Sequence, residues 1–258
     1  SQKASNISGA VSTVGSEDVE KLKPVRMEDA LQGLPGVNMF SNGAPGAKPT
    51  VIIRGVTSYT GNDPLVIVDG INQSLDDMNS LEPSDIESIS VLKDASTTAL
   101  YGVKGGNGVI VITTKSGSRN QEAKFTFNTS YGQQSPEKTI GVLNASEYAA
   151  ILNEMSVSSG GGLIFTDISN LGEGTDWQKE IFRIDAPIIT NNISVSGGTN
   201  NSSYFLSAGF TGQEGILYGG DKNYFDRSTF RGNFDIDLSS KLNMKISNRY
   251  TTVSYTHL

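Results

Sequence analysis

The chain has 258 residues, 36% of them hydrophobic, which is enough for one large folded domain or two small ones. Its 27 acidic residues outnumber 20 basic ones, and the net charge of −7 argues against nucleic acid as a partner. The absence of cysteine excludes disulfides, thiolate nucleophiles and sulfur-ligated metals.

The N-terminal part predicts short helices and strands in alternation. Ser16 can cap the first helix, and Pro35-Gly36 would end the second. In chain order the patterns predict a strand at 7–14, helices at 16–22 and 27–34, a loop at 42–49 and a strand at 51–53.

The next segment predicts a compact mixed α/β unit. Asp69-Gly70 follows a β-branched apolar run and predicts a tight hairpin turn, because both residues tolerate positive φ. Asp94 can cap a short helix that Gly102 would end. The predicted elements are strands at 65–68, 86–92 and 109–114, the last apolar enough to be covered on both faces, and a helix at 95–100.

These residues resemble a known family. The stretches PLVIVDGIN and DIESISVLKDASTTALYGVKGGNGVIVITTKSG closely resemble the end of the plug domain of TonB-dependent outer-membrane receptors of the SusC/RagA type. The resemblance extends upstream through NISGAVSTVGSEDVEKL, EDALQGLPGVN and VIIRG, and so covers most of residues 6–118. Lys104-Gly105-Gly106 departs from the family, which more often has an arginine and small residues there.

Beyond a polar linker near residues 116–121 the dominant period is two. Apolar and polar side chains alternate along each segment, as in strands with unlike surroundings on their two faces. The predicted strands lie around 125–131, 192–196, 204–211, 230–238 and 242–250, and helices are predicted at 144–155 and 176–182.

The alternation alone fits either a membrane barrel or a soluble sheet with one wet face. The plug resemblance favours the barrel and implies an α+β chain, with a mixed α/β plug domain at 1–118 and about five strands of an incomplete antiparallel transmembrane β-barrel at 119–258. A full barrel of this class needs about 22 strands, so we expect the chain to be part of a longer protein.

No catalytic or cofactor site is predicted. The single histidine, His257, lies next to the end of the chain, and no carboxylate spacing argues for an enzyme. The glycines at 102–108 match neither of the phosphate-binding motifs GxGxxG and GxxxxGK[ST]. The acidic stretch Asp69, Asp76, Asp77, Glu82 and Asp85 lacks the spacing of a calcium loop, and we expect it to be solvated or to face the barrel lumen.

The resemblance implies two groups of candidate site residues. Arg54 could pair with a carboxylate within the plug or on the wall, or could be an ordinary exposed arginine. The plug positions with a structural or gating role are Arg54, Gly55, Asp69, Gly70, Lys93, Asp94, Tyr101, Gly102, Asn107 and Gly108. The candidate lumen charges, which could contact the plug or be hydrated, are Arg231, Asp235, Asp237, Lys245 and Arg249.

The function implied by the resemblance is energised import of nutrients across the outer membrane, with glycans, oligosaccharides or peptides as ligands. The implied partners are TonB, a SusD-like surface lipoprotein and outer-membrane lipid, and no cofactor is expected. The alternative is a soluble secreted binding or adhesion module, with an α/β domain followed by a β-sandwich.

Overall fold

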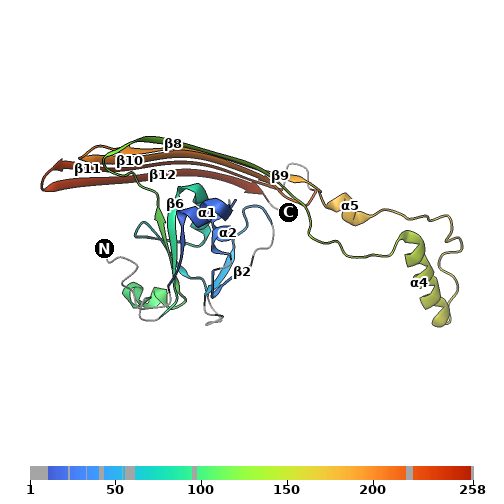
Figure 1. The fold of residues 1–258 in the computed structure, drawn as a ribbon. Coiled ribbons are helices and arrows are strands. Elements are labelled where there is room, and N and C mark those ends of the chain that lie inside the picture. Colours follow the sequence, from blue (N-terminus) through green and yellow to red (C-terminus); the bar gives the residue numbers. More distant parts are fainter. Residues whose placement is uncertain are drawn as a thin grey trace.

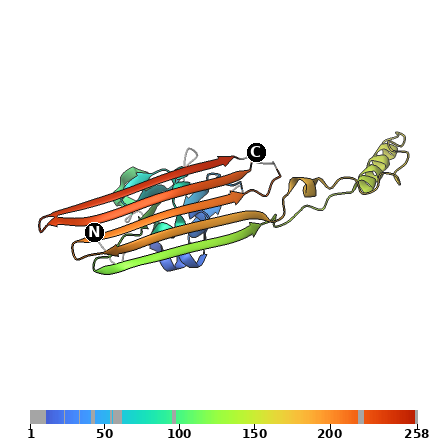
Figure 2. The same cartoon turned by 90° about the horizontal axis from the view of Figure 1, so that it is seen from above.

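A computed structural model describes residues 11–22, 24–32, 34–40, 44–53, 55, 62–94, 98–218 and 223–256 of the chain. These residues form an α/β domain and a long antiparallel sheet that curves over it (Figures 1 and 2). The connection between the first two strands of the long sheet reaches away from both bodies (Figure 1).

The α/β domain is built on a mixed five-stranded sheet in the order β1-β6-β7-β4-β5. Only the contact between β4 and β7 is parallel. The strands are β1 (Val11–Gly15), β4 (Leu65–Val68), β5 (Ile71–Gln73), β6 (Ile86–Leu92) and β7 (Val109–Thr114). The other elements are α1 (Ser16–Leu22), α2 (Met27–Leu31), the strand pair β2 (Val37–Phe40) and β3 (Thr50–Ile53), and the 3-10 helices η2 (Asp76–Ser80), η3 (Pro83–Asp85) and η4 (Ala99–Gly105).

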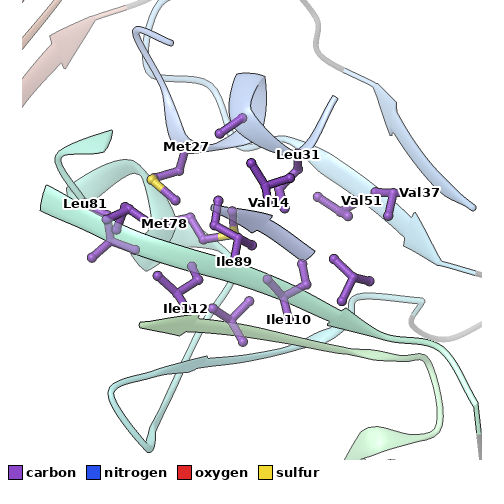
Figure 3. Close-up of a cluster of buried hydrophobic side chains, with 14 of the residues drawn as sticks. Val14, Met27, Leu31, Val37, Val51, Met78, Leu81, Ile89, Ile110 and Ile112 are labelled. Carbon is purple, nitrogen blue, oxygen red and sulfur yellow. The ribbon is translucent and has the colours of Figure 1, made fainter. Parts of the chain in front are cut away.

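The main core of the domain lies where the helices and the β2–β3 pair pack on one face of this sheet (Figure 3). Met27 and Leu31 from α2 meet Ile89, Ile110 and Ile112 from the central strands, and all five are fully buried. Each such side chain contributes about 1.5–3 kcal/mol relative to an exposed one. This burial holds the short helices in place, since helices of five to seven residues are not stable alone.

A second, smaller cluster covers the opposite face of the sheet. Ile67, Leu92 and Val109 are buried there, and Tyr101 from η4 packs against them. The prediction that the strand at 109–114 is covered on both faces is therefore confirmed. The hairpin prediction is also confirmed, because Asp69 (φ 49°) and Gly70 (φ 85°) form the turn between β4 and β5.

The long sheet is an antiparallel meander in which each strand pairs with its sequence neighbours. Its strands are β8 (Gln121–Gln134), β9 (Ala186–Gly198), β10 (Ser202–Glu214), β11 (Tyr224–Ser239) and β12 (Leu242–Thr256). They have 13 to 16 residues each, longer than the predicted segments, because the period-two pattern fades at strand ends while the hydrogen-bonded pairing continues.

The two faces of the long sheet have opposite character. Phe230, Phe234 and Ile246 lie on the face turned away from the α/β domain and are 55%, 37% and 46% exposed. Arg227 and Arg231, on the face toward the domain, are buried. Among the described residues no second layer covers the outer face, so the arrangement is not the sandwich that the soluble alternative requires.

The connection from β8 to β9 carries α4 (Ala145–Ser158) and α5 (Trp177–Ile181). Asn144 caps α4 in a reciprocal box with Glu147, and Asp176 caps α5 through the amides of Gln178 and Lys179. Asn153 then ties α4 to the returning chain, because its side chain donates to the Phe165 carbonyl and accepts from the Ile164 and Phe165 amides.

Two predicted helices differ from the structure. The predicted helix at 27–34 ends at Leu31, where the chain turns toward Pro35-Gly36. Of the predicted helix at 95–100, residues 95–97 lie outside the described ranges, and from Ala99 the backbone forms 3-10 turns that kink at Gly102 (φ 62°, ψ −153°). None of the helices in the described ranges is long and apolar enough to cross a membrane.

Gly108 allows β7 to approach β3 closely, which yields a stability prediction. Its φ is +97°, and an added Cβ would lie 2.9 Å from Ile53 Cγ2. We expect Gly108→Ala to lower the free energy of unfolding by about 1–3 kcal/mol in urea denaturation. Gly132→Ala in β8, where an added Cβ meets nothing within 4 Å, is the control and should change it by about 0.5 kcal/mol or less. Equal effects of the two substitutions would show that the close contact at Gly108 is not what matters.

Candidate functional site

The interface between the α/β domain and the inner face of the long sheet is the candidate site. On the domain side it is formed chiefly by residues 69–85, which comprise the β4–β5 turn, η2 and η3. On the sheet side it is formed by β10, β11 and β12. Acidic groups lie on the domain and arginines on the sheet, so the two surfaces are complementary in charge.

Arg227 makes the most deeply buried contact of this interface. Its Nη2 lies 2.9 Å from Glu82 Oε2 and 3.0 Å from Thr211 Oγ1, and its Nη1 donates to the Asn79 carbonyl at 3.2 Å. The Arg227 side chain is fully buried and that of Glu82 is 6% exposed. The guanidinium also lies 5.8 Å from the centre of the Phe225 ring. A charge pair this deep in the protein has few ways to be hydrated if it separates.

Arg231 makes a second pair, with the turn aspartate of the β4–β5 hairpin. Its Nη2 lies 2.8 Å from Asp69 Oδ2 and also donates to Thr114 Oγ1. Asp69 accepts from the Thr114 amide at 3.0 Å and the Thr114 hydroxyl at 2.7 Å. Burial acts to raise the pKa of Asp69, but the hydrogen bonds from Thr114 and Arg231 outweigh it and hold the pKa below its ordinary value.

Hydrogen bonds to uncharged acceptors extend the interface on both sides of these pairs. Arg249 Nη2 donates to Gln73 Oε1 at 3.2 Å, and Thr251 Oγ1 donates to the Ser80 carbonyl at 3.1 Å. Asn233 Nδ2 donates to the carbonyl of Lys115 at 2.8 Å. Directional polar bonds to the domain therefore come from β10, β11 and β12.

Asp85 is the unusual carboxyl of the interface. It is 4% exposed, and Oδ2 accepts from the Ser207 hydroxyl at 2.7 Å while Oδ1 has no hydrogen-bond partner. Burial raises its pKa to about 6, and the neighbouring Glu82 carboxylate adds to the rise, while Ser207, Arg231 and Lys115 oppose it. Asp85 is therefore a group whose charge state changes near neutral pH while it touches both bodies.

Two glycines make room for the interface. An added Cβ on Gly209 of β10 would lie 2.8 Å from Thr229 Oγ1 and 3.3 Å from Glu82 Cγ. Gly46 has φ +71°, and its Cβ would lie 2.7 Å from Phe225 Cδ2. Gly209 therefore gives Glu82 its place over the sheet, and Gly46 lets a loop of the domain touch the aromatic end of β11.

The remaining candidate lumen charges lie at the end of the sheet near the linker. Arg119 pairs with Asp235 at 2.9 Å and with Asp237, and Lys245 lies 3.3 Å from Asp235. These side chains are 27–75% exposed, so their contribution to stability is small.

Most of the predicted plug positions lie inside the α/β domain, away from the long sheet. Lys93 Nζ donates to Ser12 Oγ at 2.6 Å and to the Pro35 carbonyl, and Asn107 Nδ2 lies 3.5 Å from the Asp63 carbonyl. The Asp94 carbonyl accepts from the Thr98 amide at 2.9 Å. Gly55, Gly70, Gly102 and Gly108 all have positive φ. Arg54 lies outside the described residues, so of this group only Asp69 is seen at the interface.

The acidic stretch was expected to be solvated or to face the barrel lumen, and solvation is wrong for Glu82 and Asp85, which are buried against the sheet. Arg227 and Ser207 were not predicted as site residues. The available signal was the spacing of Arg227 and Arg231, which places both on the same face of β11. The spacing does not predict the ion-pair partner of Arg227, since Glu82 lies 145 residues away in the chain.

The fold and the interface define a class of protein in which a small α/β domain is seated against the inner face of a long-stranded antiparallel wall. The model of the TonB-dependent receptor plug domain matches residues 3–109. A TonB-dependent receptor of Formosa agariphila is 35% identical over 93% of the chain, and TonB-dependent receptor SusC of Bacteroides thetaiotaomicron is 33% identical over 96%. The chain covers 24% and 26% of these two proteins.

Solved structures agree with this match. The structure of the RagAB peptide transporter superimposes with a TM-score of 0.83 at 29% identity, covering 96% of this chain and 31% of that one. The chain belongs to the TonB-dependent receptors, and within them to the SusC/RagA type. It spans about a quarter of the length of the curated relatives it matches.

Removing Arg227 should damage the interface more than removing an exposed cation. Arg227→Ala leaves Glu82 buried without its partner, and we expect a loss of about 3–5 kcal/mol in the free energy of unfolding. Lys48→Ala is the matched control, since Lys48 pairs with Asp63 at 3.2 Å with both side chains about half exposed, and it should cost about 1 kcal/mol or less. Urea denaturation of the full-length receptor, followed by proteolysis of the released domain, measures both. Similar losses would contradict a special role for the buried pair.

Asp85 should make the seating of the α/β domain depend on pH. The pKa of Asp85 is higher in the folded than in the unfolded protein. Below about pH 4 the carboxyl is protonated in both states, so it costs the folded state no free energy. As the pH rises from about 4 to 6, the unfolded protein loses this proton more readily than the folded one, and the free energy of unfolding falls. The loss reaches about 3 kcal/mol at most above that range.

We therefore expect Asp85→Asn to raise the free energy of unfolding relative to wild type by about 2 kcal/mol more at pH 7.5 than at pH 4.5 in urea denaturation. Glu87→Gln, at an exposed carboxyl of β6, serves as control and should leave the difference between the two pH values unchanged. An effect of Asp85→Asn on stability that does not change with pH would contradict a raised pKa at Asp85.

Proposed function

We propose that this chain is the plug and the first wall strands of an importer that moves nutrients across the outer membrane, with residues 1–118 gating a lumen enclosed by 119–258 and further strands. The observation that carries the proposal is the seating of the α/β domain by buried arginine–carboxylate pairs on the polar inner face of a sheet whose outer face is apolar. No covalent chemistry is part of it.

The outer face of the long sheet supports a place in lipid. Side chains there alternate outward along every strand and include aromatic rings at both ends, as on the lipid face of outer-membrane barrels. The exposed apolar side chains are Phe125, Phe127, Tyr131, Ile189, Ile193, Phe210, Phe230, Phe234, Leu238, Leu242, Met244, Ile246 and Tyr250. The strands exceed the roughly 10 residues that a tilted membrane strand needs.

The connections support an orientation in the membrane. At one end β9–β10 and β11–β12 are joined by residues 199–201 and 240–241. At the other end residues 135–185 and 215–223 form longer connections. Because such barrels have short periplasmic turns and longer extracellular loops, the end carrying α4 and α5 faces the cell exterior in this proposal.

The distribution of contacts suggests how the plug opens. Side-chain bonds to the long sheet come from residues 69–85, from Thr114 at the end of β7 and from the linker after it. Before residue 53, the Val25 carbonyl accepts from Arg227 and Gly46 lies against Phe225. β1 is an edge strand, held by five residue pairs with β6. In this proposal a pull by TonB on the preceding chain separates the edge strand β1 first, while the part of the domain that carries Asp69 and Glu82 stays on the wall.

The proposed partners follow from the relatives. TonB is named in the curated matches, and the matching structure is of the RagAB peptide transporter. We propose TonB as the energy source, a SusD-like lipoprotein at the extracellular end, and a peptide or a glycan as cargo.

The test uses a disulfide that fastens β1 to β6. Thr13 Oγ1 and Ser90 Oγ are 3.1 Å apart, and the chain has no cysteine of its own, so Thr13→Cys with Ser90→Cys introduces a single disulfide into this part of the receptor. In cells carrying the full-length receptor, we expect uptake of its nutrient to fall at least about tenfold when the pair is oxidised and to recover with a reductant.

The matched control is Ser130→Cys with Thr190→Cys, whose hydroxyls contact each other across β8 and β9 within the wall. This disulfide should leave uptake unchanged, because the proposed wall does not open. Undiminished uptake with β1 fastened would contradict the opening of the plug at β1, and undiminished uptake in cells lacking TonB would contradict energised import altogether.

A further inference from the structure

A hollow of about 760 Å³ lies at the outer rim of the long sheet, at the end that carries α5. It is separate from the interface with the α/β domain. Its floor is apolar and its upper edge is charged. The lining residues are Arg183, Pro187, Ile189, Phe210, Gly212, Gln213, Glu214, Tyr218, Asn223, Tyr224 and Asp226.

The floor continues the apolar outer face of the sheet. Ile189 and Phe210 are 41% and 43% exposed and face the same way as the strand residues proposed to meet lipid. Gly212 makes the indentation between them and the charged edge, since a Cβ there would lie 3.2 Å from Asp226 Oδ1 and 3.4 Å from the Phe210 ring. A hydrocarbon chain could lie against this floor without leaving the membrane.

The upper edge carries both signs of charge and two tyrosine rings. Arg183 pairs with Glu214 and lies 5.5 Å from the centre of the Tyr218 ring. Tyr224 Oη lies 3.2 Å from Ser254 Oγ. Asp226 has no ion-pair partner among the described residues. With two carboxylates and one guanidinium, the edge disfavours an anionic headgroup but offers many acceptors and donors for hydroxyl groups.

The hollow is built on a fixed frame. The chain after α5 is joined to the connection between β10 and β11, because the Arg183 amide donates to the Ile216 carbonyl at 2.7 Å and the Tyr218 amide to the Ile181 carbonyl at 2.6 Å. Gly215 also donates to the Asn223 carbonyl at 2.8 Å. The polar edge is thereby positioned before any ligand arrives, which lowers the entropy cost of binding.

We propose that this hollow binds the sugar headgroup of a membrane glycolipid, with an acyl chain lying over Ile189 and Phe210. Uncharged hydroxyls match the mixed edge, the exposed Tyr218 ring offers a flat surface for a sugar ring, and the floor calls for an amphiphile and not a free sugar. The inference rests on the proposed function, since it needs the outer face to meet lipid with the α5 end at the membrane surface.

The test places the full-length receptor in phosphatidylcholine nanodiscs that contain equal amounts of diglucosyl diacylglycerol and phosphatidylglycerol with the same acyl chains. Native mass spectrometry counts the lipids retained on the ejected protein. We expect the glycolipid to be retained at least about fivefold over the anionic lipid. Asp226→Ala and Tyr218→Ala should each lower this ratio by about threefold or more.

Two further variants make the result specific. Gly212→Leu fills the indentation while leaving every charge in place, and it should also abolish the preference. Glu180→Ala, at an exposed carboxyl of α5 outside the hollow, should leave it unchanged. Equal retention of both lipids, or an unaltered preference in Asp226→Ala, would overturn the proposal. Loss of the glycolipid on adding millimolar free maltose would also overturn it, because the hollow would then be a site for soluble sugar.

The two proposals fail differently. A receptor that does not insert into bilayers contradicts the proposed function itself. A receptor that inserts and imports its nutrient with TonB, but shows no preference among lipids, contradicts only the glycolipid site.

Discussion

The arrangement of the whole chain depends on two buried arginines of β11 meeting carboxylates of the α/β domain. Taking a guanidinium and a carboxylate out of water is costly, and the cost is recovered only where the partners meet in good geometry. Arg227 with Glu82 and Arg231 with Asp69 satisfy this condition at 2.9 and 2.8 Å. Any shift of the domain along the sheet by one residue would separate both pairs, so they fix its position more than they add to its stability.

The same constraint explains why the interface is polar. A small domain bound to the sheet through an apolar surface would be hard to remove. The free energy of exposing apolar area to water grows with the area, and it opposes separation until the whole surface is exposed. Hydrogen bonds are short-ranged and exchange for water once it enters. The contacts of Arg249, Thr251 and Asn233 belong to this exchangeable type. A seated but removable domain is what the proposed gating needs.

The sequence predicts those parts of the fold that local chemistry determines. Asp69-Gly70 predicts its turn because few dipeptides adopt positive φ twice, and the alternation along residues 230–238 predicts which side chains face the domain because a strand has a strict period of two. The helix expected at 27–34 ends early because its length depends on how much of it the core can cover, which local pattern does not record. The buried role of Asp85 depends on Ser207, 122 residues later, and no spacing within the sequence links them.

The position of these charges along the chain connects the fixed interface to the proposed movement. Glu82 and Asp69 lie in the part of the domain that continues through β7 and the linker into β8, so force carried by that part ends on the long sheet. β1 lies at the opposite edge of the domain sheet, beyond β6. Between them the helices α1 and α2 pack in the shared core. If the buried pairs lay on β1 or α1 instead, a pull from the N-terminus would have to break them first, and the domain would leave the wall as a block. In the proposed opening, the placement of these pairs at and after residue 69 would let the chain yield first on its N-terminal side, from which the force is proposed to come.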